Sequence, residues 1–132
     1  MVWDVLVVGS GPGGAAAAIG ARHADPTASV LMLDRAEFPR DKTCGDAVLG
    51  TAFERLAEYG VDTATLTAGF GPEHHLRLTS AGPRSYRRPL TDSMTVLPRR
   101  VFDARLRDAA LAAGAQSQHL SLIHISEPTR PY

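Results

Sequence analysis

The sequence has one cysteine, no excess of either charge and no long apolar run, and each absence narrows the classes of protein to consider. With Cys44 as the sole thiol, no disulfide can form within the chain. The 14 basic and 14 acidic side chains cancel, which removes the electrostatic reason to expect nucleic acid binding. No apolar stretch has the length that crosses a bilayer, so we expect no transmembrane segment. Clusters of Cys and His with metal-ligand spacing are also missing, and we expect no metal site.

The N-terminal part of the chain has the pattern of a strand–turn–helix–strand unit. Val2–Val8 is short, apolar and β-branched, which is typical of a buried parallel strand. Asp4 interrupts this run and glycines follow it, so the run does not resemble a signal peptide. We expect an alanine-rich helix over Ala15–His23 and a second apolar strand over Ser29–Leu33. This unit predicts a parallel βαβ fold.

The rest of the chain predicts an α/β fold with a small antiparallel insertion. Arg35–Asp46 is polar and interrupted by proline and glycine, as expected for a loop. We expect a helix, two strands of a β-hairpin, one further strand and an amphipathic helix over Ala47–Tyr59, His74–Thr79, Ser85–Leu90, Ser93–Leu97 and Arg99–Ala113. The parallel sheet would be Rossmann-like, doubly wound and incomplete, with one exposed edge.

The C-terminal residues differ in character from the rest. Leu120–Arg130 resembles one reading frame of a transposon-end adapter used in DNA sequencing libraries. We therefore expect residues 120–132 to be a non-native tail and residues 1–119 to be the native part of the chain. The alternative is a native strand over Leu120–Ile125, since a strand is expected soon after Gly114.

A glycine-rich turn carries the strongest chemical signal. Gly9–Gly14 fits the pattern Gly-x-Gly-x-x-Gly, and it follows a strand and opens a helix, as its mechanism requires. Gly9 permits the tight turn, Gly11 lets the backbone approach a pyrophosphate, and Gly14 lets the helix pack closely on the strand. The free N–H groups of the helix N-terminus would then face the phosphates. The alternative is a glycine turn with a structural role only.

An acidic residue stands where such a fold places the ribose ligand. Asp34 follows Gly14 by twenty residues, at the end of the second strand, and its carboxylate can accept hydrogen bonds from an adenosine ribose. A basic residue near this position is typical of sites for a 2′-phosphate. Arg35 adjoins Asp34, and the choice between a free ribose and a phosphorylated one stays open.

Three segments together resemble known flavoproteins. Asp4–Gly14 resembles the opening of FAD-dependent oxidoreductases of the glutathione-reductase fold type. Phe38–Asp46 is similar to the Pro-Arg-x-Lys-x-Cys-Gly segment of the geranylgeranyl reductase family, with related segments in flavin-dependent halogenases and aromatic-ring monooxygenases. Leu97–Leu106 resembles a later segment of the same families, in which an arginine near a helix start helps to hold FAD. The resemblance covers residues 2–115, and it implies that residues 1–119 are the N-terminal part of an FAD/NAD(P)-binding domain.

The resemblance implies a set of cofactor-binding residues. The glycine turn would contact the pyrophosphate, the end of the second strand would bind the adenosine ribose, and the Pro-Arg-x-Lys-x-Cys-Gly segment would lie on the flavin side of FAD. The residues implied for the pyrophosphate are Gly9, Gly11, Pro12, Gly13 and Gly14, and those for the adenosine ribose are Asp34 and Arg35. The residues implied on the flavin side are Arg40, Cys44, Gly45 and Asp46. Arg99 would be the arginine that contacts FAD. Arg100 is the alternative if the register differs by one. For Cys44 we favour packing near the flavin over a reactive thiol, for which Lys42 and a helix starting at Ala47 could supply positive charge.

The resemblance also implies a function. The full-length parent would be an FAD-dependent oxidoreductase that reduces C=C bonds of an isoprenoid lipid, with NAD(P)H as a candidate reductant. The alternatives are an FAD-dependent monooxygenase or halogenase, and a dinucleotide-binding module without catalysis. The segment Pro39–Asp46 disfavours a simple NAD-binding domain. We expect the catalytic residues downstream of this chain, which alone would be inactive, and a cytoplasmic location, with peripheral membrane association of the full-length enzyme as the alternative.

Overall fold

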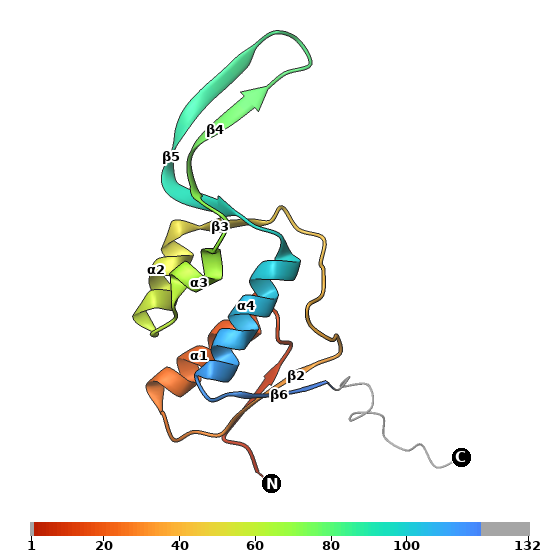
Figure 1. The fold of residues 1–132 in the computed structure, drawn as a ribbon, viewed down its shortest axis with the longest axis vertical. Coiled ribbons are helices and arrows are strands. Elements are labelled where there is room, and N and C mark those ends of the chain that lie inside the picture. Colours follow the sequence, from red (N-terminus) through yellow and green to blue (C-terminus); the bar gives the residue numbers. More distant parts are fainter. Residues whose placement is uncertain (1, 120–132) are drawn as a thin grey trace, which may run out of the picture.

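The computed structural model describes residues 2–119, and the tail predicted over 120–132 lies outside these residues. A parallel sheet is formed by β1 (Val5–Val8), β2 (Val30–Asp34) and β6 (Gln116–His119) in the order β1-β2-β6 (Figure 1). The helix α1 (Pro12–Ala24) connects β1 to β2. The predicted βαβ unit is therefore confirmed, with the second strand shifted by one residue toward the C-terminus from the expected Ser29–Leu33.

The helices α1 and α4 (Arg99–Ala112) pack together on one face of this sheet. Side chains alternate along each strand, and Val5 and Val7 of β1 join Met32 of β2 in a core with both helices. Leu6 and Val8 point to the other face, where they are 54% and 57% exposed. The sheet thus has one covered face and one open face at β1.

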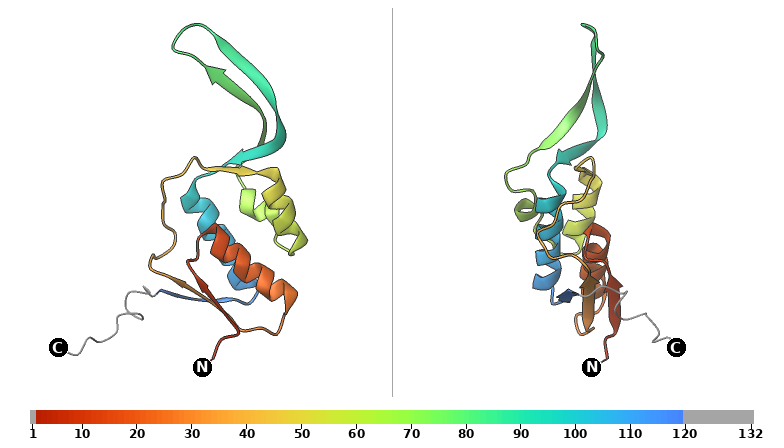
Figure 2. Two further views of the ribbon diagram at one scale, coloured as in Figure 1. Left: turned by 180° about the vertical axis from the view of Figure 1, so that it is seen from behind. Right: turned by 90° about the vertical axis from the view of Figure 1, so that its right-hand side faces the viewer.

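The antiparallel sheet contains the predicted hairpin, which is longer than expected. β4 (Pro72–Thr79) pairs with β5 (Ser85–Val96), and the hairpin projects away from the helices (Figures 1 and 2). The separate strand expected over Ser93–Leu97 is wrong, because these residues mostly continue β5. They pair there with a short strand, β3 (Ala47–Leu49), in the sheet order β3-β5-β4.

The helix expected over Ala47–Tyr59 begins later than predicted. Val48 pairs with Thr95, so the first three residues are drawn into β3, and the helix α2 runs from Gly50 to Glu58. A Cβ atom at Gly50 would overlap Oγ of Ser93, which shows how closely this junction lies against β5.

One short helix, α3 (Thr63–Thr67), has no counterpart in the prediction. It begins after Asp62, whose Oδ1 accepts hydrogen bonds from the backbone N–H groups of Ala64 (3.0 Å) and Thr65 (3.3 Å). Such a cap supplies partners for two N–H groups that have none within the helix.

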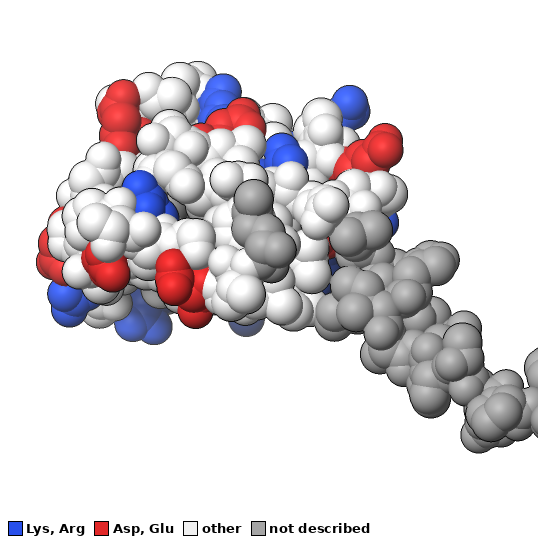
Figure 3. Space-filling view, turned by 90° about the horizontal axis from the view of Figure 1, so that it is seen from below, with Lys and Arg blue, Asp and Glu red and all other residues white. Residues whose placement is uncertain are grey.

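The surface offers no strongly charged face in the view of Figure 3, where basic and acidic side chains are interspersed. This agrees with the balance of charges in the sequence. Among residues 2–119, no helix combines the length and the apolar character needed to cross a membrane.

Candidate functional site

The carboxyl ends of β1 and β2 bring the glycine turn and Asp34 together. The strands are parallel neighbours, with Val8 opposite Leu33, so both chains leave the sheet at the same edge. The backbone N–H of Gly9 donates to the carbonyl of Leu33 (2.7 Å), and the N–H of Ser10 donates to Oδ2 of Asp34 (2.6 Å). The acidic residue is therefore fixed directly against the turn.

The geometry of the turn explains two of its glycines. Gly9 has a φ of +94°, a conformation that residues with a Cβ atom rarely adopt. A Cβ atom at Gly14 would overlap the carbonyl oxygen of Gly9, and it would lie 3.2 Å from Cγ1 of Val7. The tight turn at Gly9 and the close packing at Gly14 are both confirmed as sequence predictions.

The N-terminus of α1 is open toward this edge. Gly11 is the N-cap residue and provides no side-chain cap, and the first turn holds no acidic side chain. Oγ of Ser10 is buried and has no hydrogen-bond partner among residues 2–119. Free N–H groups and an unpartnered hydroxyl are a suitable environment for an anion.

A buried carboxylate on α4 holds two arginines beside the turn. Asp103 is 0% exposed, and Arg99 donates to it from Nε (2.6 Å) and Nη2 (2.9 Å). Nη1 of Arg40 lies 3.1 Å from Oδ2 of Asp103 without the alignment of a hydrogen bond. The other end of the Arg40 guanidinium reaches the glycine turn, since its Nη2 would lie 3.1 Å from a Cβ atom at Gly11.

The end of the loop that carries Arg40 docks at the start of α4. The carbonyl of Asp46 accepts from the N–H of Leu97 (2.8 Å), and its Oδ1 accepts from the N–H of Arg99 (3.3 Å). Asp46 has a φ of +57°, which is uncommon for a residue other than glycine. A cavity of about 190 Å³ opens here, lined by Pro12, Cys44, Asp46, Ala47, Val48, Arg99 and Phe102.

Most of the chain aligns with part of a known protein. No protein-family model matches the chain. It is 36% identical over 122 residues to the menaquinone reductase of Mycolicibacterium smegmatis, an alignment that covers 86% of this chain and 28% of that protein. Most of this chain is therefore similar in sequence to part of a reductase.

Two solved structures have a similar fold. A geranylgeranyl bacteriochlorophyll reductase-like protein from Thermoplasma acidophilum has 28% sequence identity and a TM-score of 0.61, over 87% of this chain and 29% of that one. The myxobacterial chondrochloren halogenase CndH shares the fold, with a TM-score of 0.73 at 23% identity over 88% and 28% of the two chains. The predicted fold class is confirmed, and the chain spans 28–29% of the length of each of these proteins.

The structure gathers most of the residues that the flavoprotein resemblance singled out. Pro12, Cys44, Asp46 and Arg99 line one cavity, while Arg40 reaches Gly11 at its margin. Arg99 lines this cavity, whereas Arg100 is exposed and does not, which favours the first of the two predicted registers. Three other predicted residues are exposed and do not line the cavity: Gly13, Arg35 and Gly45.

The Cys44 thiol lies in a setting that favours its thiolate. The backbone N–H of Asp46 is the largest influence that lowers the pKa of Cys44, followed by the side chain of Arg99. The sequence suggested Lys42 and a helix starting at Ala47 instead, but the helix begins at Gly50. The positive charge beside the thiol therefore comes from α4.

This source of charge predicts the reactivity of the thiol. We expect Arg99→Met to raise the pKa of Cys44, because the cation that stabilises the thiolate is lost. The pH profile of alkylation by iodoacetamide should then move to higher pH. Lys42→Met is the control and should leave the profile unchanged. A profile that moves with Lys42 and not with Arg99 would contradict this assignment.

Asp103 is the member of the site that sequence reasoning did not identify. It follows Phe102, whose side chain is 5% exposed, and it stands four residues after Arg99 on one helix. An arginine and an aspartate at this spacing form a pair on a helix surface. The sequence therefore held one signal for a buried Asp103: it adjoins the apolar face of the helix and has an arginine four residues before it.

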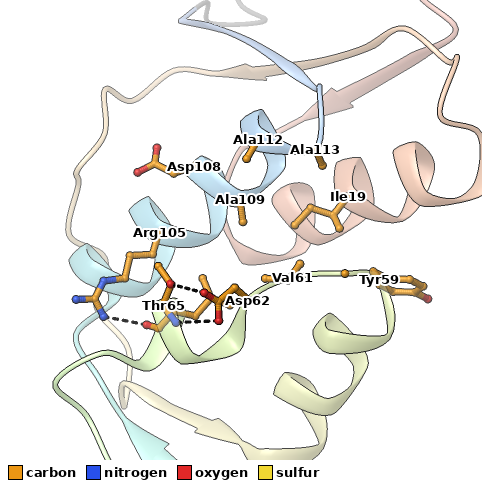
Figure 4. A pocket seen from close by; sticks show the side chains of 12 residues that line it. Ile19, Tyr59, Val61, Asp62, Thr65, Arg105, Asp108, Ala109, Ala112 and Ala113 are labelled. Carbon is orange, nitrogen blue, oxygen red and sulfur yellow. Dashed lines mark hydrogen bonds between the residues drawn. The ribbon is translucent and has the colours of Figure 1, made fainter.

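A larger cavity of about 480 Å³ lies between α1, α4 and the segment joining α2 to α3 (Figure 4). None of the predicted cofactor-binding residues lines it. Two of its polar side chains are engaged elsewhere, since Asp62 caps α3 and Arg105 donates to the carbonyls of Leu66 and Ala68, both at 2.9 Å. The smaller cavity at the glycine turn is therefore the candidate site.

Proposed function

We propose that this chain forms the adenosine- and pyrophosphate-binding part of the FAD site of an oxidoreductase that reduces C=C bonds of an isoprenoid lipid. The observation that carries the proposal is the convergence of the glycine turn, Asp34 and Arg99 at one edge of the sheet. The identity to a menaquinone reductase supports an isoprenoid quinone as the class of substrate. NAD(P)H is the proposed reductant.

The residues at this edge fit an adenine dinucleotide. Each oxygen of Asp34 accepts one backbone N–H, from Ser10 to Oδ2 and from Ala36 to Oδ1. A carboxylate has about four acceptor sites, so capacity remains for ribose hydroxyls. The open N-terminus of α1 and the guanidinium of Arg40 would meet the pyrophosphate. The flavin supplies the electron chemistry when bound, and the protein binds and orients it.

The first test is cofactor choice. In calorimetric titrations of the chain, we expect FAD to bind more tightly than NAD. Gly11→Val should weaken FAD binding by about tenfold or more, which corresponds to about 1.4 kcal/mol, because its side chain would occupy the approach of the pyrophosphate. Gly20→Ala, a change in the same helix where a Cβ atom meets nothing within 4 Å, is the matched control. Tighter binding of NAD would contradict the proposal.

The second test is the reaction. Residues 1–119 can replace the matching segment of the M. smegmatis menaquinone reductase. We expect the chimera to retain flavin and to reduce menaquinone. A chimera that retains flavin but consumes oxygen and hydroxylates or halogenates an aromatic substrate would favour the monooxygenase or halogenase alternative. A chimera that folds without flavin would contradict an FAD site.

We further propose that residues 120–132 derive from a library adapter. The support is the resemblance of Leu120–Arg130 to an adapter reading frame. Sequencing the source DNA across codon 119 tests the proposal directly. A native frame that continues differently after codon 119 is the expected result, and a genomic frame that encodes Leu120–Tyr132 would overturn it.

A further inference from the structure

Asp103 connects two arginines that reach different parts of the candidate site. Its carboxylate is 0% exposed, and the side chains of Arg40 and Arg99 are 20% and 15% exposed. Arg40 comes from the loop after β2, whereas Arg99 and Asp103 lie on α4. One buried carboxylate therefore links the loop to the helix.

The two arginines point to neighbouring positions along the proposed path of the cofactor. Nη2 of Arg40 lies beside Gly11 in the glycine turn, and Arg99 lies beside Cys44 and Asp46 in the cavity. The ring of Phe38 also fixes Arg40, whose Cζ lies 5.0 Å from the ring centroid. Arg40, Arg99 and Asp103 together carry one net positive charge, and the carboxylate of Asp46 lies in the same cavity.

We propose that Asp103 is a positioning residue that holds Arg40 toward the pyrophosphate of the dinucleotide and fixes Arg99 in the adjoining cavity. This role rests on the proposed function. A guanidinium binds a phosphate well only when its fork is held in place, because fixing a long side chain costs conformational entropy. Asp103 supplies that constraint from the buried side of both arginines and does not itself contact the ligand.

The role predicts an effect that depends on the ligand. Asp103→Asn should weaken binding of ADP and FAD by about tenfold or more, because Arg40 at the pyrophosphate and Arg99 beside it lose the carboxylate that fixes them. Binding of adenosine, which has no phosphate and would contact Asp34, should be unchanged. Arg55→Gln, which breaks an exposed arginine–carboxylate pair with Glu58, is the matched control and should affect neither ligand.

A second variant covers the case in which Asp103→Asn does not fold. Arg40→Lys keeps the positive charge of a partly exposed side chain but loses the fork, and it should weaken ADP binding without changing adenosine binding. In an Arg40→Gln/Arg99→Gln background, Asp103→Asn should have no further effect on ADP binding, because no aligned arginine remains.

The titrations distinguish this role from the proposed function. If the wild-type chain binds adenosine and ADP with equal affinity, or binds neither, the proposed dinucleotide site fails and the role of Asp103 fails with it. If the wild type prefers ADP but Asp103→Asn weakens adenosine and ADP equally, the residue is structural only. Selective loss of ADP affinity supports the proposal.

Discussion

A Gly14→Ala variant is expected to lose about 3 kcal/mol or more of the free energy of unfolding, the upper end of what overpacking costs. The added Cβ atom would overlap the carbonyl oxygen of Gly9 and lie 2.9 Å from its carbonyl carbon. Both are backbone atoms of a turn that is fixed by the hydrogen bond from the N–H of Gly9 to the carbonyl of Leu33, so moving either atom would disrupt that bond. The helix would have to separate from the strand.

Gly20→Ala in the same helix provides the control. No atom lies within 4 Å of a Cβ atom there, and alanine in place of glycine in a helix interior stabilises it by up to about 1 kcal/mol. Urea unfolding followed by circular dichroism would compare both variants with the parent chain. Equal midpoints for Gly14→Ala and the parent chain would show that the turn is not packed as described.

The glycine turn could be predicted from sequence because its physical causes are local. A positive φ at Gly9 and the close approach at Gly14 both arise within a few residues of the turn. The spacing from Gly14 to Asp34 reflects one helix and one strand of ordinary length. Features that depend only on near neighbours in the sequence can therefore be predicted from the sequence alone.

The start of α2 was misplaced because it depends on a partner distant in sequence. Ala47–Leu49 has a pattern that suits a helix, and its pairing with Met94–Val96 of β5 makes it a strand. The five residues of α3 are too few for a helical period to show, and only the cap at Asp62 marks it. Tertiary context decides such short segments.

The prediction of the site was incomplete for the same reason: one of its members depends on a contact between distant segments. Arg40, Cys44 and Arg99 were identified from motifs, but the carboxylate that joins Arg40 to Arg99 was not. The pairing of Arg40 with Asp103 connects a loop to a helix, and no periodicity within either segment indicates it. A buried ion pair between separate segments is visible only once the fold is known.

The energetics of this cluster lead to a second large effect. Asp103→Leu is expected to lower the free energy of unfolding by about 3–5 kcal/mol, because it leaves two largely buried arginines without their shared partner. Glu58→Ala, which removes the partner of the exposed Arg55, should change stability little, since water already solvates both side chains.

Replacing all three charged residues separates stability from binding. The triple variant Arg40→Met/Arg99→Met/Asp103→Leu leaves none of these three charges in the buried cluster. We expect it to regain most of the stability that Asp103→Leu loses, since apolar residues often replace buried ion pairs without loss of stability. The same variant should not bind ADP selectively, because both guanidinium groups are gone. Urea unfolding and calorimetry on one preparation would measure both quantities.

A triple variant as unstable as Asp103→Leu would indicate that the packing of these side chains, rather than their charge, holds α4 against the loop. If the triple variant regains stability but has lost selective ADP binding, the charges serve the ligand more than the fold.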